Sequence, residues 1–151
     1  MNWVTTPHVH YDRVASAWLI KRHIDNDARF FFEAPGQPSN RPKDAIPFSM
    51  PGAKLGPHDE TGCTFEKIVR EYKIQDPAIH LMEKVIAAGV NYVLKGFRPA
   101  SNDRYGQMGV GFLAFADGMM LLKTDDQERL DASYLVYDSM YALFKANKQR
   151  G

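Results

Sequence analysis

The stretch that decides the fold is residues 3–33, WVTTPHVHYDRVASAWLIKRHIDNDARFFFE. Its first four residues are aromatic or β-branched, which predicts a short strand over Trp3–Thr6. Asp12 is a suitable N-cap for a helix running to about His23, with apolar residues on one broad stripe. Residues 25–27 (DND) are typical of a turn, and Arg29–Glu33 predicts a second strand. This order places a small sheet near the N-terminus.

The next segment, residues 34–63, is rich in proline and glycine and cannot hold a long helix. One brief strand is expected around Ala45–Phe48. Long irregular connections inside compact domains often carry binding residues, so this loop is a natural place for a functional surface.

From Thr64 onward the pattern is helical. Asp76-Pro77 is a helix start, an N-cap followed by proline at the first helical position, and Gly89 is the expected end of that helix. Residues 108–122 are apolar nearly all round and predict a buried helix whose glycines allow close packing.

The last helix should begin at a capping box over residues 124–127. Its core stripe is spaced by steps of 4, 3, 4 and 3: Leu130, Tyr134, Tyr137, Tyr141 and Phe144. We therefore predict an α+β fold, a mostly helical single domain over residues 1–151 with a small N-terminal sheet and a long proline-rich loop.

The composition narrows the class of protein. Lys and Arg number 19 against 18 Asp and Glu, a formal net charge of +1, which gives direct DNA binding no support. Cys63 is the single cysteine, so no intramolecular disulfide forms and a reducing compartment fits best. There is no signal-peptide pattern and no apolar run long enough for a membrane helix. A cytoplasmic protein with no membrane partner is expected.

Polar residues with ligand chemistry gather in two places. The first is the segment His8–Arg13, between the first strand and the first helix, and the second is His58–Glu66, where the proline-rich loop meets a helix. Imidazole, carboxylate and thiolate groups bind zinc and similar ions, although neither segment has an HExxH or paired CxxC spacing.

Each candidate also has a purely structural interpretation. Asp12 suits an N-cap, Glu66 a first helical turn and His58 a solvated loop. Cys63 suits a small buried residue, and Asp138, beside the aromatic stripe, either bonds to a neighbour or points into a site.

Several segments together resemble the C-terminal domain of the chromate-resistance protein family ChrB. They are Trp3-Val-Thr, Asp12–Arg22, Ile24-Asp25, Ala28–Phe30, Ile46–Gly52, His58, Cys63-Thr-Phe-Glu66, Asp76-Pro-Ala78, Val136-Tyr-Asp138 and Met140-Tyr141. The resemblance covers nearly the whole chain. It implies a cytoplasmic protein linked to resistance against chromate or oxidative stress. Longer members carry an N-terminal region that resembles a DNA-binding regulator, and this chain corresponds to their C-terminal module. Residues 86–106 depart from the family pattern.

Because the matching segments gather the polar residues, we predict a polar pocket that binds a divalent metal ion of unknown identity. His58, Glu66 and Asp12 are the expected ligands, and Arg13 faces a small anion; Cys63 and Asp138 are further pocket candidates.

Two alternatives stay open. The first is a metal-assisted hydrolase or redox enzyme acting on an oxyanion. The second is a regulatory or interaction module that acts through a partner chain.

Overall fold

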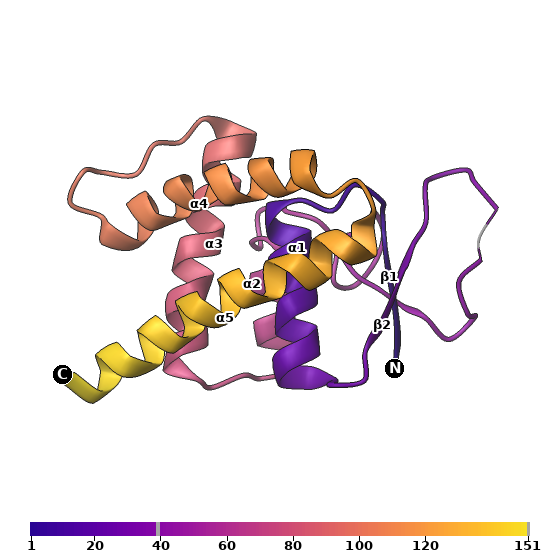
Figure 1. The fold of residues 1–151 in the computed structure, drawn as a ribbon, viewed down its shortest axis with the longest axis horizontal. Coiled ribbons are helices and arrows are strands. Elements are labelled where there is room, and N and C mark those ends of the chain that lie inside the picture. The colour runs from indigo at the N-terminus through magenta and orange to yellow at the C-terminus, as the bar shows by residue number, and fades with distance from the viewer. Residues whose placement is uncertain (39, 151) are drawn as a thin grey trace.

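The computed structural model describes residues 1–38 and 40–150, with a small sheet on one side of a larger helical part (Figure 1). The described elements are β1 (Asn2–Thr5), α1 (Tyr11–Leu19), a π-helical turn (Ile20–Ile24), β2 (Arg29–Phe32), β3 (Ile46–Pro47), α2 (Thr64–Glu71), α3 (Pro77–Lys95), α4 (Arg104–Leu122) and α5 (Asp126–Arg150). The predicted α+β class is confirmed.

The sheet is parallel, with strand order β2-β1-β3. Asn2 pairs with Arg29 on one side of β1, and Trp3 pairs with Ile46 on the other. Because β1 is central, its residues from Trp3 to Thr5 are buried. After β1 the chain forms β2 at one edge of the central strand and then β3 at its other edge. Because β1 and β3 are parallel neighbours, their carboxyl ends lie next to each other.

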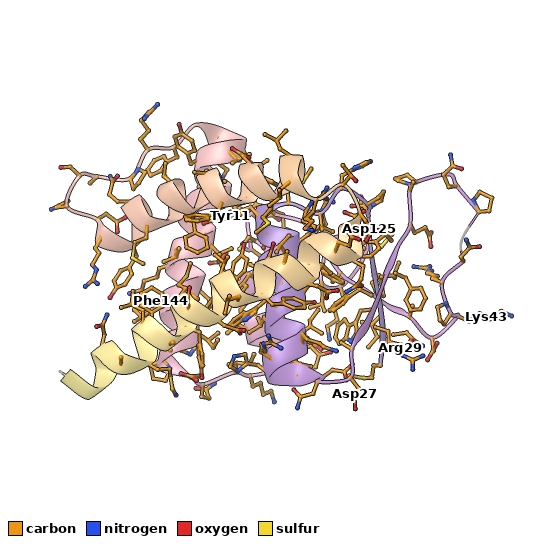
Figure 2. All side chains as sticks on the ribbon, viewed as in Figure 1. Tyr11, Asp27, Arg29, Lys43, Asp125 and Phe144 are labelled. Atoms are coloured by element: carbon orange, nitrogen blue, oxygen red, sulfur yellow. The ribbon has the colours of Figure 1, made fainter. Side chains whose placement is uncertain are left out.

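Two glycines make close packing possible here: Gly109 of α4 lies against the α3 backbone, and Gly89 of α3 makes room for Tyr11 of α1. A Cβ on Gly89 would overlap the Tyr11 ring, and one on Gly109 would overlap the carbonyl oxygen of Val85. The Tyr11 hydroxyl lies between α3 and α4 and donates to the carbonyl oxygens of Val85 (3.2 Å) and Gly109 (3.0 Å) (Figure 2). The prediction that Gly89 ends its helix is wrong, because this glycine serves packing.

Helix α3 instead ends at Lys95, where Gly96 takes the left-handed conformation at φ 63°. Its start is as predicted: Pro77 is the first helical residue, and the Asp76 carboxylate accepts from the Ala78 amide at 2.9 Å.

Helix α4 is far more exposed than its sequence predicts. Within it only Gly106, Gly109 and Leu113 are buried. Phe115 and Leu121 are 59% and 87% exposed. The expectation of a buried helix is wrong, because α4 lies on the outside of the molecule and packs mainly on α3.

Helix α5 crosses α1 (Figure 1), and its aromatic stripe packs in the core. Leu130, Tyr134, Tyr137 and Phe144 are buried and Tyr141 packs against the same core, as the spacing predicts. The cap differs from the prediction, because the Asp125 carboxylate accepts from the Glu128 amide at 2.9 Å and the helix begins at Asp126. None of the helices in the described part of the chain is long and apolar enough to span a membrane.

Candidate functional site

A cavity of about 220 Å³ lies where the chain continues from the carboxyl ends of β1 and β3. Its lining comes from the start of α1, the segment after β3 and the second half of α3: His10, Tyr11, Asp12, Arg13, Ser49, Pro57, His58, Val90, Val93 and Leu94. We call this space the strand-end cavity. It brings Asp12, Arg13 and His58 to one lining, which does not include Glu66, Cys63 or Asp138.

Asp12 lies in the first turn of α1, but it does not cap that helix, whose N-cap is His10. Its carboxylate instead accepts from the α2 amides of Thr64 (2.9 Å) and Phe65 (3.1 Å). The prediction of a cap on its own helix is wrong, and the residue caps a neighbouring one. Burial raises the pKa of Asp12, and these amide bonds oppose the shift.

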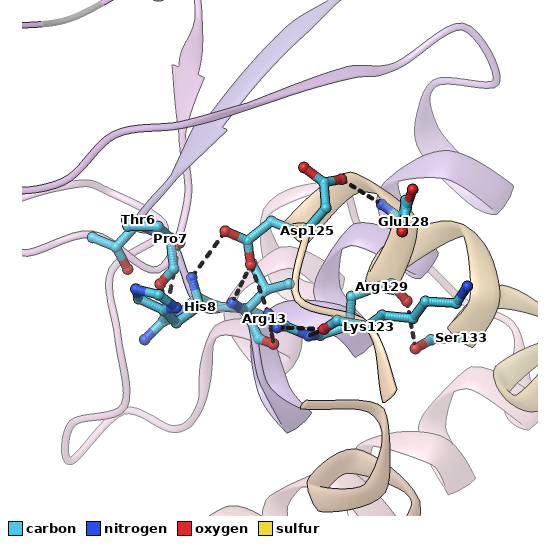
Figure 3. A network of polar contacts seen from close by, with 11 residues as sticks. Thr6, Pro7, His8, Arg13, Lys123, Asp125, Glu128, Arg129 and Ser133 are labelled. Atoms are coloured by element: carbon cyan, nitrogen blue, oxygen red, sulfur yellow. Dashed lines mark hydrogen bonds and ion pairs between the residues drawn. The ribbon is translucent and has the colours of Figure 1, made fainter. Parts of the chain in front are cut away.

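Arg13 stabilises the connection between β1 and α1. One guanidinium nitrogen donates to the carbonyl oxygens of Thr6 (3.3 Å) and Pro7 (3.0 Å), as Figure 3 shows. Burial lowers the pKa of Arg13, while Asp12 and Asp126 act in the opposite direction. Arg13 is among the lining residues of the cavity, and its guanidinium group carries a positive charge.

A second network holds the same connection from the α5 side. The Asp126 carboxylate accepts from the backbone amides of His8 (3.0 Å) and Val9 (2.8 Å). Arg129 pairs with Asp126 at 2.8 Å and donates to the carbonyl oxygen of Lys123 at 2.7 Å (Figure 3). The loop that leads into the cavity is therefore fixed at both ends.

His58 is one of the described residues whose buried side-chain polar atoms lack a hydrogen-bond partner; the others are Thr5, His23 and Tyr134. Both ring nitrogens of His58 are buried, and neither has a hydrogen-bond partner among the described residues. Burying a polar group without a partner costs about 1–3 kcal/mol. The ring lines the strand-end cavity and also a second space of about 610 Å³ beside α2. The His58 ring thus lines two spaces, and its two nitrogens have no hydrogen-bond partner within the described part of the chain.

Ser49 is a lining residue that the sequence analysis missed. It follows β3, is 8% exposed, and has φ 51°, a left-handed conformation that costs energy in a residue with a Cβ. His8, which follows β1, has φ 60°. Strained positions of this kind often occur at binding sites. The SerMetProGly turn at residues 49–52 was the available signal, but its geometry is not readable from sequence.

Glu66 does not reach the strand-end cavity. Its carboxylate accepts from the Cys63 amide at 2.8 Å at the start of α2. It lines a different cavity of about 910 Å³ beside α3, together with His80 and Glu83, whose side chains are 2.6 Å apart. Asp12 and Glu66 therefore both accept from amides at the amino end of α2.

The other two pocket candidates, Cys63 and Asp138, lie outside the lining of the strand-end cavity. Cys63 is buried, and burial raises the pKa of its thiol, with nearby Asp12 adding to the shift. Asp138 accepts from the Trp18 indole at 2.7 Å and forms two bonds with Arg22, each 2.9 Å long. The bonds from Arg22 hold the pKa of Asp138 below its usual range. Asp138 is thus bonded to its neighbours.

The described residues contain no group of three or more His, Cys, Asp and Glu side chains that could hold a metal ion. His58 and Asp12 share the strand-end cavity, and Glu66 lies outside it. The divalent-metal site stays a prediction.

The fold and the cavity define a small α+β module with a cavity of mixed polar and apolar lining near the carboxyl ends of β1 and β3. Residues 3–144 match the family described as "ChrB, C-terminal domain", and the chain belongs to this family. It is 29% identical over 150 residues to a protein named "Protein ChrB" from Cupriavidus metallidurans. That match covers 98% of this chain and 42% of the relative. No solved structure matches the chain.

Proposed function

We propose that this chain is the ligand-binding module of a chromate-resistance system and that the strand-end cavity binds a small tetrahedral oxyanion. The family membership supports the link to chromate resistance. The main support for an oxyanion as the ligand is the imidazole of His58, which lines the cavity and whose buried nitrogens have no hydrogen-bond partner among the described residues. The buried, lone cysteine supports a working place in the cytoplasm.

The position of the cavity supports a binding role. In parallel sheets, ligands bind outside the carboxyl ends of the strands, at the point where the chain leaves in opposite directions. Here β1 connects to β2 on one side, and β3 pairs on the other. The segments after β1 and after β3 each contribute lining residues, Arg13 and His58 among them.

The donors around the cavity favour an anion. His58 has free ring nitrogens, Arg13 is cationic, and Ser49 carries a hydroxyl. The one carboxylate in the lining, Asp12, accepts from two amides at the amino end of α2, where the helix dipole is positive. Those bonds offset its charge, so an anion meets little repulsion there.

A divalent metal ion is the alternative ligand, with His58 and Asp12 as its candidate donors on the cavity wall. A lone imidazole and a carboxylate with two bonded amides make a poorer cation site than a chelating set of three or four ligands. The oxyanion is therefore the better match to the lining.

The test is calorimetric titration of the purified chain with chromate and, separately, with sulfate. We expect saturable 1:1 binding that falls by about tenfold or more in His58→Leu, because a hydrogen bond to a charged group is lost. The thermal midpoint of that variant should equal or exceed that of the wild type, since a buried unpartnered group is removed.

His80→Leu is the matched control, because His80 lines the cavity beside Glu66 and should leave binding unchanged. Absence of saturable binding by the wild type, or equal affinity in His58→Leu, contradicts the proposal. If the purified protein contains a stoichiometric metal ion that is lost in His58→Leu, the ligand of the cavity is a cation and the oxyanion proposal is wrong.

A further inference from the structure

Lys67 on α2 is a buried lysine. Its side chain is 9% exposed, and its ammonium group donates to the carbonyl oxygen of Pro57 (2.6 Å) and to a carboxylate oxygen of Asp59 (2.7 Å). These two residues flank His58 in the sequence. One cation therefore fixes the backbone on the amino side of His58 and the side chain that follows it.

A buried ammonium group is costly to desolvate, and its two short bonds are what offset that cost. The Asp59 carboxylate also accepts from the Thr61 amide (2.8 Å) and the Thr61 hydroxyl (2.6 Å). The bond from Lys67 is the largest influence holding the pKa of Asp59 well below its usual range. The turn after His58 is thus joined to α2 through Lys67.

His58 has no hydrogen bond of its own to set its orientation, because both ring nitrogens lack partners. Its position must come from packing and from the backbone on either side. We propose that Lys67 is a positioning residue, which holds the His58 imidazole in place for the ligand. This inference rests on the proposed function of the strand-end cavity.

Lys54 provides a matched comparison. It lines the same 610 Å³ space as Lys67 and His58, and it forms an ion pair of 2.6 Å with Glu71. Its side chain is 78% exposed, and the hydrogen bonds found for it do not reach residues 57–59. Removing Lys54 changes the local charge by the same amount and leaves the His58 segment attached.

The experiment measures chromate affinity by calorimetry and the His58 ring signals by nitrogen-15 NMR in Lys67→Met, Lys67→Arg and Lys54→Met. Loss of a residue that orients a ligand group commonly weakens binding by about tenfold to a hundredfold. We expect that loss in Lys67→Met together with shifted or broadened His58 signals. Lys67→Arg should recover part of the affinity, and Lys54→Met should match the wild type.

Asp59→Asn is a second test of the same role. The Asp59 side chain is 46% exposed, and its replacement weakens the ion pair with Lys67 without removing the buried ammonium group. It should give a smaller loss of affinity and the same movement of the His58 signals. If Lys67→Met fails to fold, this variant decides the matter.

Unchanged affinity and unchanged His58 signals in the folded variants would overturn the positioning role. Loss of binding in His58→Leu with full binding in Lys67→Met would overturn this inference alone. Full binding in His58→Leu would instead overturn the proposed function.

Discussion

Asp12 was expected to cap its own helix, α1, but its carboxylate accepts hydrogen bonds from the neighbouring helix α2. Its carboxylate is buried between α1 and α2 and bonds to two α2 amides. A helix usually receives its cap from the residue just before it. Here the residue before α2 is Cys63, and an acidic side chain 52 positions away supplies the acceptor.

Replacing Asp12 tests this tertiary cap. Asp12→Ala leaves two buried amides without partners and should lower the free energy of unfolding by about 2–4 kcal/mol. Asp12→Asn keeps an oxygen acceptor and should cost less than half as much. Urea unfolding followed by circular dichroism measures both. A loss of less than half a kcal/mol in Asp12→Ala, as is common for surface substitutions, would show that the amides find other partners.

His23 should make the stability depend on pH. The ring packs against Trp18 and Tyr141 with centroids 5.3 and 4.9 Å away, tilted by 59° to the indole and edge-on at 72° to the tyrosine ring. Burial lowers its pKa from 6.5. Asp76 and Asp138 face it with negative charge, and Lys145 and Arg22 face it with positive charge.

Because the unfolded chain binds a proton at His23 more readily than the folded one, this residue destabilises the fold as pH falls below about 6.5. The variant His23→Phe keeps an aromatic ring and removes the titration. We expect its thermal midpoint to fall less than that of the wild type between pH 7 and pH 5. An equal fall in both proteins would contradict the assignment.

Sequence reasoning proposed His58, Asp12 and Arg13 because imidazole, carboxylate and guanidinium groups in a loop beside a helix start suit ligand binding, and the structure places all three in the lining of one cavity. It did not identify Lys67, since lysine is ordinarily exposed and its burial depends on where the 57–59 turn folds back. It also grouped Glu66 with His58 because the two are close in sequence. The helical turn directs the Glu66 carboxylate back to Cys63 and away from the strand-end cavity.

At the scale of the elements, the packing of α3 against α4 depends on which glycine faces the neighbour. Gly109 faces the Val85 carbonyl, whereas Gly111 has nothing within 4 Å of the position a Cβ would take. The two glycines lie in the same helix, two residues apart, and therefore make a matched pair.

Gly109→Ala should lower the free energy of unfolding by about 1–3 kcal/mol, because the added methyl forces the helices apart. Gly111→Ala should raise it by about 0.5–1 kcal/mol, because alanine favours the helix over glycine. Urea unfolding of both variants provides the comparison. Equal effects of the same sign would mean that the close approach of α3 and α4 does not depend on Gly109.

Helix positions were predictable where apolar spacing and caps agree, as in α5 and at the start of α3. Burial was not predictable for α4, because an apolar helix on the outside has the same composition as one in the core. The end of α3 was misplaced for a related reason. Glycine both ends helices and permits close contact, and only the presence of Tyr11 beside Gly89 separates the two roles.

At the scale of the whole molecule, the parallel order β2-β1-β3 creates the site. The sequence predicts that the short strands exist, but it does not predict which edge of β1 each of the other strands joins. That choice brings the segment after β3, with Ser49 and His58, beside the segment after β1, with Asp12 and Arg13. The gathering of polar residues in the sequence led us to expect a pocket, whereas the position of this cavity depends on the strand order and on the packing of α3, which adds Val90, Val93 and Leu94 to its lining.

The most direct test of oxyanion binding is an anomalous difference map at the chromium absorption edge, from crystals of this chain soaked in chromate. We predict one peak in the strand-end cavity, within hydrogen-bonding distance of the His58 imidazole, that disappears in His58→Leu crystals. A map with no peak in that cavity, or one whose peak persists without His58, would contradict the account.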